Sequence, residues 1–105
     1  MKRLAGLVLV ALAAGCGGGG DVDETTEQAV VTAAKAAYAK ARLEGIDMTN
    51  GPCLGVIVPN WVADVAHDPR QPVDDDPANQ CEAYRAGEAE HFVELDPDGN
   101  VIRVE

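Results

Sequence analysis

The chain has 105 residues, with 18 acidic against 8 basic side chains and a formal net charge of −10. A chain of this length forms one domain at most. The acidity excludes a general nucleic-acid binder, which needs a basic surface to displace counterions from phosphate, and it argues against docking onto anionic lipid by charge alone.

The first residues are typical of an export signal. Lys2 and Arg3 form a short positive segment, and the run from Leu4 to Ala14 is apolar. This run has the length of the apolar region of a secretory leader, and it is shorter than the roughly 20 residues of a membrane-spanning helix. We therefore expect the segment to be removed rather than to remain as a permanent anchor.

The leader ends in Ala13-Ala14-Gly15-Cys16, which resembles the lipobox of bacterial lipoproteins. In that family the cysteine thiol is alkylated with diacylglycerol, and cleavage of the signal peptide then makes the cysteine the first residue of the mature chain. The resemblance implies that residues 1–15 are a signal peptide and that Cys16 bears the lipid. The alternative is an ordinary secreted protein in which Cys16 keeps its thiol.

The residues after Cys16 are suited to a lipid-anchored protein, because Gly17 to Gly20 is an uninterrupted glycine run of the kind that a flexible tether requires. We assign residues 16–24 to the lipidated cysteine and its tether, and residues 25–105 to the folded domain. The acyl chains would supply the membrane affinity that an acidic domain lacks. We expect the protein in the cell envelope, at the outer membrane or periplasmic face of a Gram-negative bacterium or on the outer face of a Gram-positive plasma membrane.

The domain is predicted to begin with one helix. Thr25 and Gln28 are spaced as a capping box, the segment from Glu27 to Glu44 is rich in alanine and free of Gly and Pro, and Gly45 is a suitable stop. One face of this helix carries mostly small side chains, which favours close packing on a flat sheet. The residues of that face are Val30, Ala34, Ala37, Tyr38 and Ala41.

Four strands and a second, short helix are predicted to follow. The strand segments are Leu54 to Val58, Trp61 to His67, His91 to Leu95 and Val101 to Val104. The segment from Trp61 to His67 is also compatible with a helix. The short helix is predicted from Pro77 to Arg85, with Asp76 as its N-cap, after a loop from Asp68 to Asp76.

The last two strands form the clearest hairpin, because turn-forming residues fill the segment from Asp96 to Asn100 and Gly99 supplies a residue that adopts a positive φ without steric cost. The order α-β-β-α-β-β predicts an α+β fold, in which the N-terminal helix packs on a small antiparallel sheet. Trp61, the largest side chain in a domain poor in aromatics, is predicted to lie in the core.

Cys53 and Cys81 remain once Cys16 is assigned to lipid, and an even number of cysteines in an exported chain predicts a disulfide. The bridge would close the intervening loop and stabilise the domain by about 3.6 kcal/mol on the chain-entropy estimate. A redox pair or metal thiolates are the alternatives, although the CxxC spacing of catalytic dithiols is absent from the sequence.

His67 and His91 are the two histidines, and each lies at the end of a predicted strand beside an acidic residue. If those strands paired, the imidazoles would form a metal site with a carboxylate such as Asp68; otherwise they are ordinary surface or edge-strand histidines. The acidic run from Asp74 to Asp76 would gather a cation loosely with Asp68, or it is a solvated loop that ends in a helix cap. The sequence shows neither a Ser-His-Asp order nor a nucleotide-binding loop, so no catalytic residue is predicted.

Together these features predict a non-enzymatic binding or interaction module, attached to the membrane by lipid and without a cofactor. They do not identify its protein or small-molecule partner. The alternative is a metal-dependent envelope enzyme or metal-binding protein that uses His67 and His91.

Overall fold

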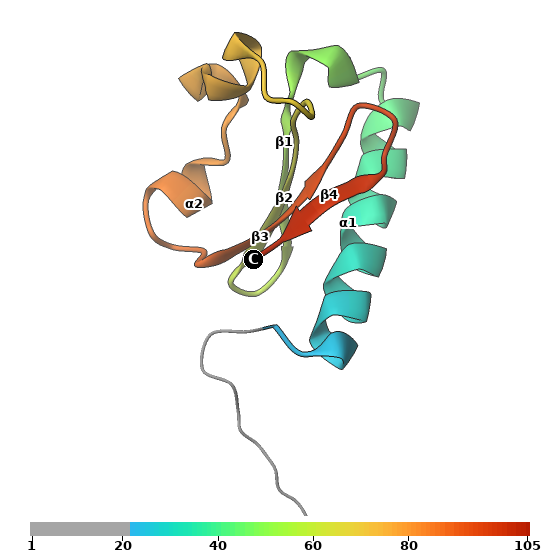
Figure 1. Cartoon of the computed structure of the whole chain (residues 1–105), viewed down its shortest axis with the longest axis vertical. Helices are drawn as coiled ribbons and strands as arrows, with labels where there is room; N and C mark the ends of the chain where they lie inside the picture. The colour runs from blue at the N-terminus through green and yellow to red at the C-terminus, as the bar shows by residue number, and fades with distance from the viewer. Residues whose placement is uncertain (1–21) are drawn as a thin grey trace, which may run out of the picture.

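The computed structural model describes residues 22–105. The predicted signal peptide (residues 1–15), the lipidation site Cys16 and the glycine run after it lie outside the described residues. Within residues 22–105 the chain has the predicted α+β fold, with one long helix packed on a four-stranded sheet (Figure 1). No helix in this part of the chain is both long enough and apolar enough to cross a membrane.

Helix α1 (Glu24–Leu43) begins ahead of the predicted capping box. Its N-cap is Asp23, whose carboxylate accepts a hydrogen bond of 2.8 Å from the backbone N–H of Thr26. The predicted cap at Thr25 is therefore wrong, because an aspartate offers the same acceptor together with a charge that suits the helix dipole. The helix ends ahead of Gly45, which has the left-handed φ of 82° expected after a helix.

The sheet consists of β1 (Cys53–Val58), β2 (Trp61–Val65), β3 (His91–Leu95) and β4 (Val101–Val104), in that spatial order. The two outer pairs, β1 with β2 and β3 with β4, are antiparallel hairpins as predicted. The central pair is parallel, with Trp61 opposite His91 and Val65 opposite Leu95. The sheet is thus mixed, and the prediction of a purely antiparallel sheet is wrong.

The parallel pairing follows from the segment between β2 and β3, because a chain that returns to pair in parallel must cross the sheet first, usually over a dozen residues or more. Residues 66–90 make that crossing on the sheet face opposite α1 (Figure 1). They include two 3₁₀-helices, η3 (Pro72–Asp75) and η4 (Pro77–Asn79), and the four-residue helix α2 (Glu82–Arg85). A further 3₁₀-helix, η2 (Met48–Asn50), lies between α1 and β1.

The second predicted helix is interrupted. Asp76 caps it and Pro77 starts it as expected, since the Asp76 carboxylate accepts a hydrogen bond from the N–H of Ala78. Gln80 and Cys81 then adopt extended backbone, and the helix resumes only at Glu82. Cys81, one of the two residues in this extended break, is also the residue that forms the disulfide with Cys53.

The two faces of the sheet pack against different parts of the chain. Trp61, Ala63 and Val65 of β2 point toward α1 and form the main core together with Val93 and Leu95. Trp61 is buried as predicted, and its ring stacks on that of His91 with a centroid distance of 4.7 Å. The opposite face carries a smaller cluster under the crossover segment, whose members are Val62, Cys81 and Ala89 with Cys53, Ala83 and Phe92 at its edge.

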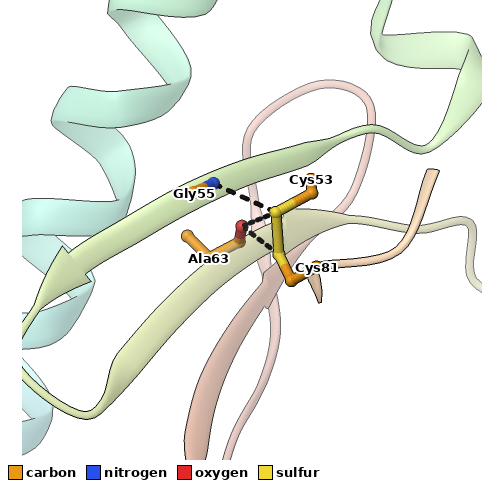
Figure 2. Close-up of a disulfide and its surroundings, with 4 residues drawn as sticks. All are labelled: Cys53, Gly55, Ala63 and Cys81. Atoms are coloured by element: carbon orange, nitrogen blue, oxygen red, sulfur yellow. Dashed lines mark hydrogen bonds between the residues drawn. A yellow bond between two sulfur atoms is a disulfide. The ribbon is translucent and has the colours of Figure 1, made fainter. Parts of the chain in front are cut away.

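The predicted Cys53–Cys81 disulfide is present, with the two Cα atoms 5.0 Å apart, inside the range that a bridge requires. It joins the start of β1 to the residue that precedes α2. Figure 2 shows the two sulfurs beside the carbonyl oxygen of Ala63, at 3.8 and 3.4 Å, and the N–H of Gly55 donating to the Cys53 sulfur. The bridge therefore fastens the crossover segment to the first two strands.

The turn between β3 and β4 packs on α1. The Tyr38 hydroxyl donates a hydrogen bond of 2.7 Å to the carbonyl oxygen of Pro97. Gly99 has the predicted positive φ, at 91°, and a Cβ atom built on it would lie 2.8 Å from the Tyr38 ring. Gly99 is thus required for the turn conformation and for the close approach to the helix.

Candidate binding cleft

A cleft of about 420 Å³ lies between the crossover segment and the sheet face that points away from α1. We call it the Asp64 cleft. The sheet supplies Val62, Asp64, Phe92 and Glu94, and the crossover segment supplies Arg70, Gln80, Cys81, Tyr84 and Arg85. Its volume falls in the range of small-molecule sites.

Strand alternation explains why these side chains meet. Val62 and Asp64 of β2 lie two residues apart, as do Phe92 and Glu94 of β3, so each pair points to the same face. The parallel register then places Asp64 directly opposite Glu94. The two carboxyl groups are consequently side by side at the bottom of the cleft.

Glu94 is engaged by arginines on both sides. One of its oxygens is 3.0 Å from Arg70 of the crossover segment, and the other is 3.4 Å from Arg103, its cross-strand neighbour on β4. The Glu94 side chain is 7% exposed, so two cations compensate a carboxylate that is almost fully withdrawn from water. Glu94 is therefore a paired structural charge.

Asp64 has no such partner. Its Oδ1 atom is buried and meets no hydrogen-bond donor of residues 22–105. Burial, reinforced by the negative charges of Glu94 and Asp74 against the opposing effect of Arg70 and Arg103, raises the pKa of Asp64 to about 7. A buried acceptor of this kind is costly to the fold. The Asp64 residue as a whole is partly exposed and lines the cleft, so the rest of its carboxyl group is what a ligand would meet.

Aromatic side chains form one wall of the cleft. The rings of Tyr84 and Phe92 meet edge to face with centroids 5.3 Å apart, and Val62, which also lines the cleft, lies opposite Phe92 in the sheet. Arg85 also lines the cleft, and no ion pair within the described residues involves it. The site thus combines an apolar wall, a buried carboxyl group and an arginine without an anionic partner.

Asp75 and Asp76 are exposed and Asp76 caps η4, as the interpretation of a solvated loop that ends in a helix cap requires. Asp74 departs from that interpretation, because it is buried. Its carboxylate accepts hydrogen bonds from the backbone N–H groups of His67 and Gln71 and lies 3.0 Å from the His67 imidazole. Burial by itself would raise the pKa of Asp74, but these hydrogen bonds outweigh burial and hold the pKa below its ordinary value. Asp74 therefore fixes the start of the crossover segment.

The structure does not bring the two histidines together. His91 is opposite Trp61 at one end of the β2–β3 pair, whereas His67 follows β2 beyond the other end and binds Asp74. Asp68 is exposed beside His67. Among the described residues, no three His, Cys, Asp or Glu side chains are grouped so that they would hold a metal ion. The two cysteines that were alternative thiolate ligands form the disulfide.

Sequence reasoning did not single out Asp64 and Glu94. The signal that would have found them is an acidic residue at an interior position of each of two short apolar strands, WVADV and HFVEL. Charged side chains are seldom buried unless they are paired or functional. Their adjacency follows from the parallel register, which strand patterns do not encode.

No protein-family model, curated protein or solved structure matches this chain.

Proposed function

We propose that this protein is a lipid-anchored binding module of the cell envelope and that the Asp64 cleft is its ligand site. The observation that carries the proposal is the combination, in one concave site, of a buried carboxyl group without a hydrogen-bond donor and an aromatic wall. Apolar pockets with a few convergent polar groups are the usual form of small-molecule sites.

Binding is favoured over catalysis by the charge arrangement. A mechanism that uses a pair of carboxyl groups as acid and base needs both of them free to exchange protons with a substrate. Glu94 is held by Arg70 and Arg103, so the cleft offers Asp64 as its one free carboxyl group among the described residues. The lipid anchor is proposed from the resemblance of Ala13-Ala14-Gly15-Cys16 to the lipobox.

The position of α1 supports a module that binds ligand while anchored. The proposed tether leads into α1, and α1 and the crossover segment lie on opposite faces of the sheet (Figure 1). The cleft lies on the crossover side. The helix that follows the proposed tether therefore does not cover the cleft.

The proposed site is tested by nuclear magnetic resonance on the full chain, isotopically labelled and solubilised in a non-ionic detergent. A panel of small aromatic amines, carboxylates and alcohols would be titrated into it, with a detergent blank for each compound. We expect at least one class to shift the backbone amides of Val62, Phe92 and Arg85 in a saturable manner. Saturable shifts confined to α1 or to the outer edge of β1 would contradict the cleft as the ligand site.

A further inference from the structure

We infer that the ligand of the Asp64 cleft is a small organic monocation, a primary ammonium group on a flat apolar body, with the ammonium bound to Asp64 and the body against Tyr84 and Phe92. The inference rests on the proposed ligand site and deepens it by naming the class of ligand.

The hydrogen-bonding inventory of the cleft indicates a donor on the ligand. Asp64 Oδ1 is a buried acceptor without a donor among the described residues. Asp64 is nevertheless partly exposed and lines the cleft. An ammonium group at the exposed side of the carboxyl group would supply a donor together with a positive charge, and such charge-assisted hydrogen bonds are about twice as strong as neutral ones. A neutral amide or hydroxyl would supply the donor but would leave the burial of an ionised Asp64 uncompensated.

Asp64 is the acid in this cleft whose charge a ligand would neutralise, because the other acids near it already have partners. The groups that face it are Glu94 on β3, Arg103 on β4, and Arg70 and Asp74 of the crossover segment. Glu94 is paired with both arginines, and Asp74 is saturated by donors from His67 and Gln71. Only Asp64 among these three acids is without a partner.

The other residues that line the cleft determine the shape and the total charge of the ligand that would fit. Tyr84, Phe92 and Val62 form an apolar wall that suits a flat hydrocarbon body. Arg70 and Arg85 also line the cleft, so a second positive charge on the ligand would be repelled. The site therefore favours a monoamine over a diamine with the same body.

Benzylamine is the probe for this inference, with three relatives that share its ring. Benzyl alcohol keeps the shape without the charge, benzoate reverses the charge, and para-xylylenediamine adds a second ammonium group. We expect calorimetric titration of the full chain in detergent to rank benzylamine first. Asp64→Asn should weaken benzylamine binding by at least about tenfold, whereas the matched control Asp98→Asn, which makes the same charge change on the exposed turn of the last hairpin, should leave it unchanged.

A pH series adds a readout that a merely structural role for Asp64 would not move. The amine stays protonated below pH 8, so affinity should rise by about tenfold per pH unit from pH 5 to about pH 7 and then level off as Asp64 ionises. At pH 6 binding should release about one proton per ligand, as measured from the dependence of the heat on buffer ionisation enthalpy. Neither effect should survive in Asp64→Asn.

The outcomes separate the two proposals. If benzyl alcohol or benzoate binds at least as tightly as benzylamine and shifts the amides of Val62 and Phe92, the cleft is a ligand site but the cationic class is wrong. The same conclusion holds if Asp64→Asn binds benzylamine as well as the parent chain. If none of the four compounds shifts the amides of the cleft, the inference is overturned together with the cleft as a site for small aromatic ligands.

Discussion

In the ligand-free protein, Asp64 gives the fold a pH dependence of its own. The pKa of this carboxyl group is about 7 in the folded protein and near the ordinary value of 3.8 in the unfolded chain. Between these values the folded state binds more protons than the unfolded state. The contribution of Asp64 to the free energy of unfolding therefore falls as pH rises from about 4 to about 7, by up to about 1.4 kcal/mol per unit, and is constant above that range.

The Asp64→Asn variant isolates this effect. We expect it to melt at a higher temperature than the parent chain at pH 8, because the amide avoids the cost of burying an ionised carboxylate, and the difference should shrink toward pH 4. Melting curves recorded by circular dichroism at several pH values would measure it, with Asp98→Asn as the control. A difference in melting temperature that stays constant from pH 4 to pH 8 would show that folding does not raise the pKa of Asp64.

Gly99 is the residue on which the packing of the last hairpin against α1 depends. Its φ of 91° disfavours any side chain, and a Cβ would come within 2.8 Å of Tyr38, whose hydroxyl already binds Pro97. Gly45 has a similar φ of 82°, but nothing lies within 4 Å of the Cβ that it would carry. Substitutions at Gly45 and Gly99 therefore distinguish two costs, because the first meets backbone strain alone and the second meets backbone strain together with a steric clash.

We expect Gly45→Ala to cost about 1–2 kcal/mol of unfolding free energy, which is the ordinary penalty for a left-handed residue with a side chain. Gly99→Ala should cost more, and Gly99→Val more again, because Tyr38 must move and its hydrogen bond to Pro97 is put at risk. Urea denaturation would give the three values. Equal losses for Gly45→Ala and Gly99→Ala would mean that the Tyr38 ring yields without cost.

The disulfide acts at the scale of elements, because it joins β1 to the segment that forms the outer wall of the cleft. It closes a loop with a sequence separation of 28 residues, for which the chain-entropy estimate is about 3.6 kcal/mol. At about 4–8 °C per kcal/mol for a domain of this size, reduction should lower the melting temperature by well over 10 °C.

The comparison that checks this uses the parent chain and a double variant, Cys53→Ser with Cys81→Ser, each scanned with and without reductant. The parent should lose stability on reduction, whereas the double variant should melt low in both conditions. A parent chain that melts at the same temperature with and without its bridge, reduction being verified by thiol titration, would contradict the estimate.

Most elements of the fold were predictable because local rules determine them. Alanine-rich periodicity located α1, alternation located the strands, and the turn before Val101 fixed the last hairpin, including Gly99. The cap at Asp23 was missed because two acceptors precede the helix and spacing alone does not rank them. The break at Gln80 and Cys81 was missed because no glycine or proline marks it in the sequence.

The candidate site was less predictable, since it depends on contacts between distant segments. Alternation already placed Val62 and Asp64 on one face of their strand, but it did not show that β3 would lie parallel beside it. Without that register Glu94 has no reason to adjoin Asp64. The burial of both acids also depends on residues 66–90, for which the sequence predicted a loop and a short helix but not their place on the sheet.

At the scale of the whole molecule, the proposed lipid anchor at Cys16 lies outside the described residues 22–105, whereas the proposed ligand site lies within them. Cys16→Ser should convert a protein that partitions into the detergent phase into a soluble or uncleaved one, because the acyl chains supply the membrane affinity. Phase separation in a cloud-point detergent, followed by immunoblotting, measures the partition. A serine variant that still enters the detergent phase would refute the lipid anchor.

One face of the sheet packs on α1 and the other lines the cleft, and this division affects how the sequence of the protein would change in evolution. Trp61, Ala63 and Val65 hold the sheet on α1, whereas their neighbours Val62 and Asp64 face the cleft. Tyr84 and Arg85 line the cleft from exposed positions that lie outside the main core. Substitutions there would change what is recognised at small cost to folding, so the domain is suited to act as a scaffold on which new specificities arise by drift and selection, or by a library of variants confined to the crossover.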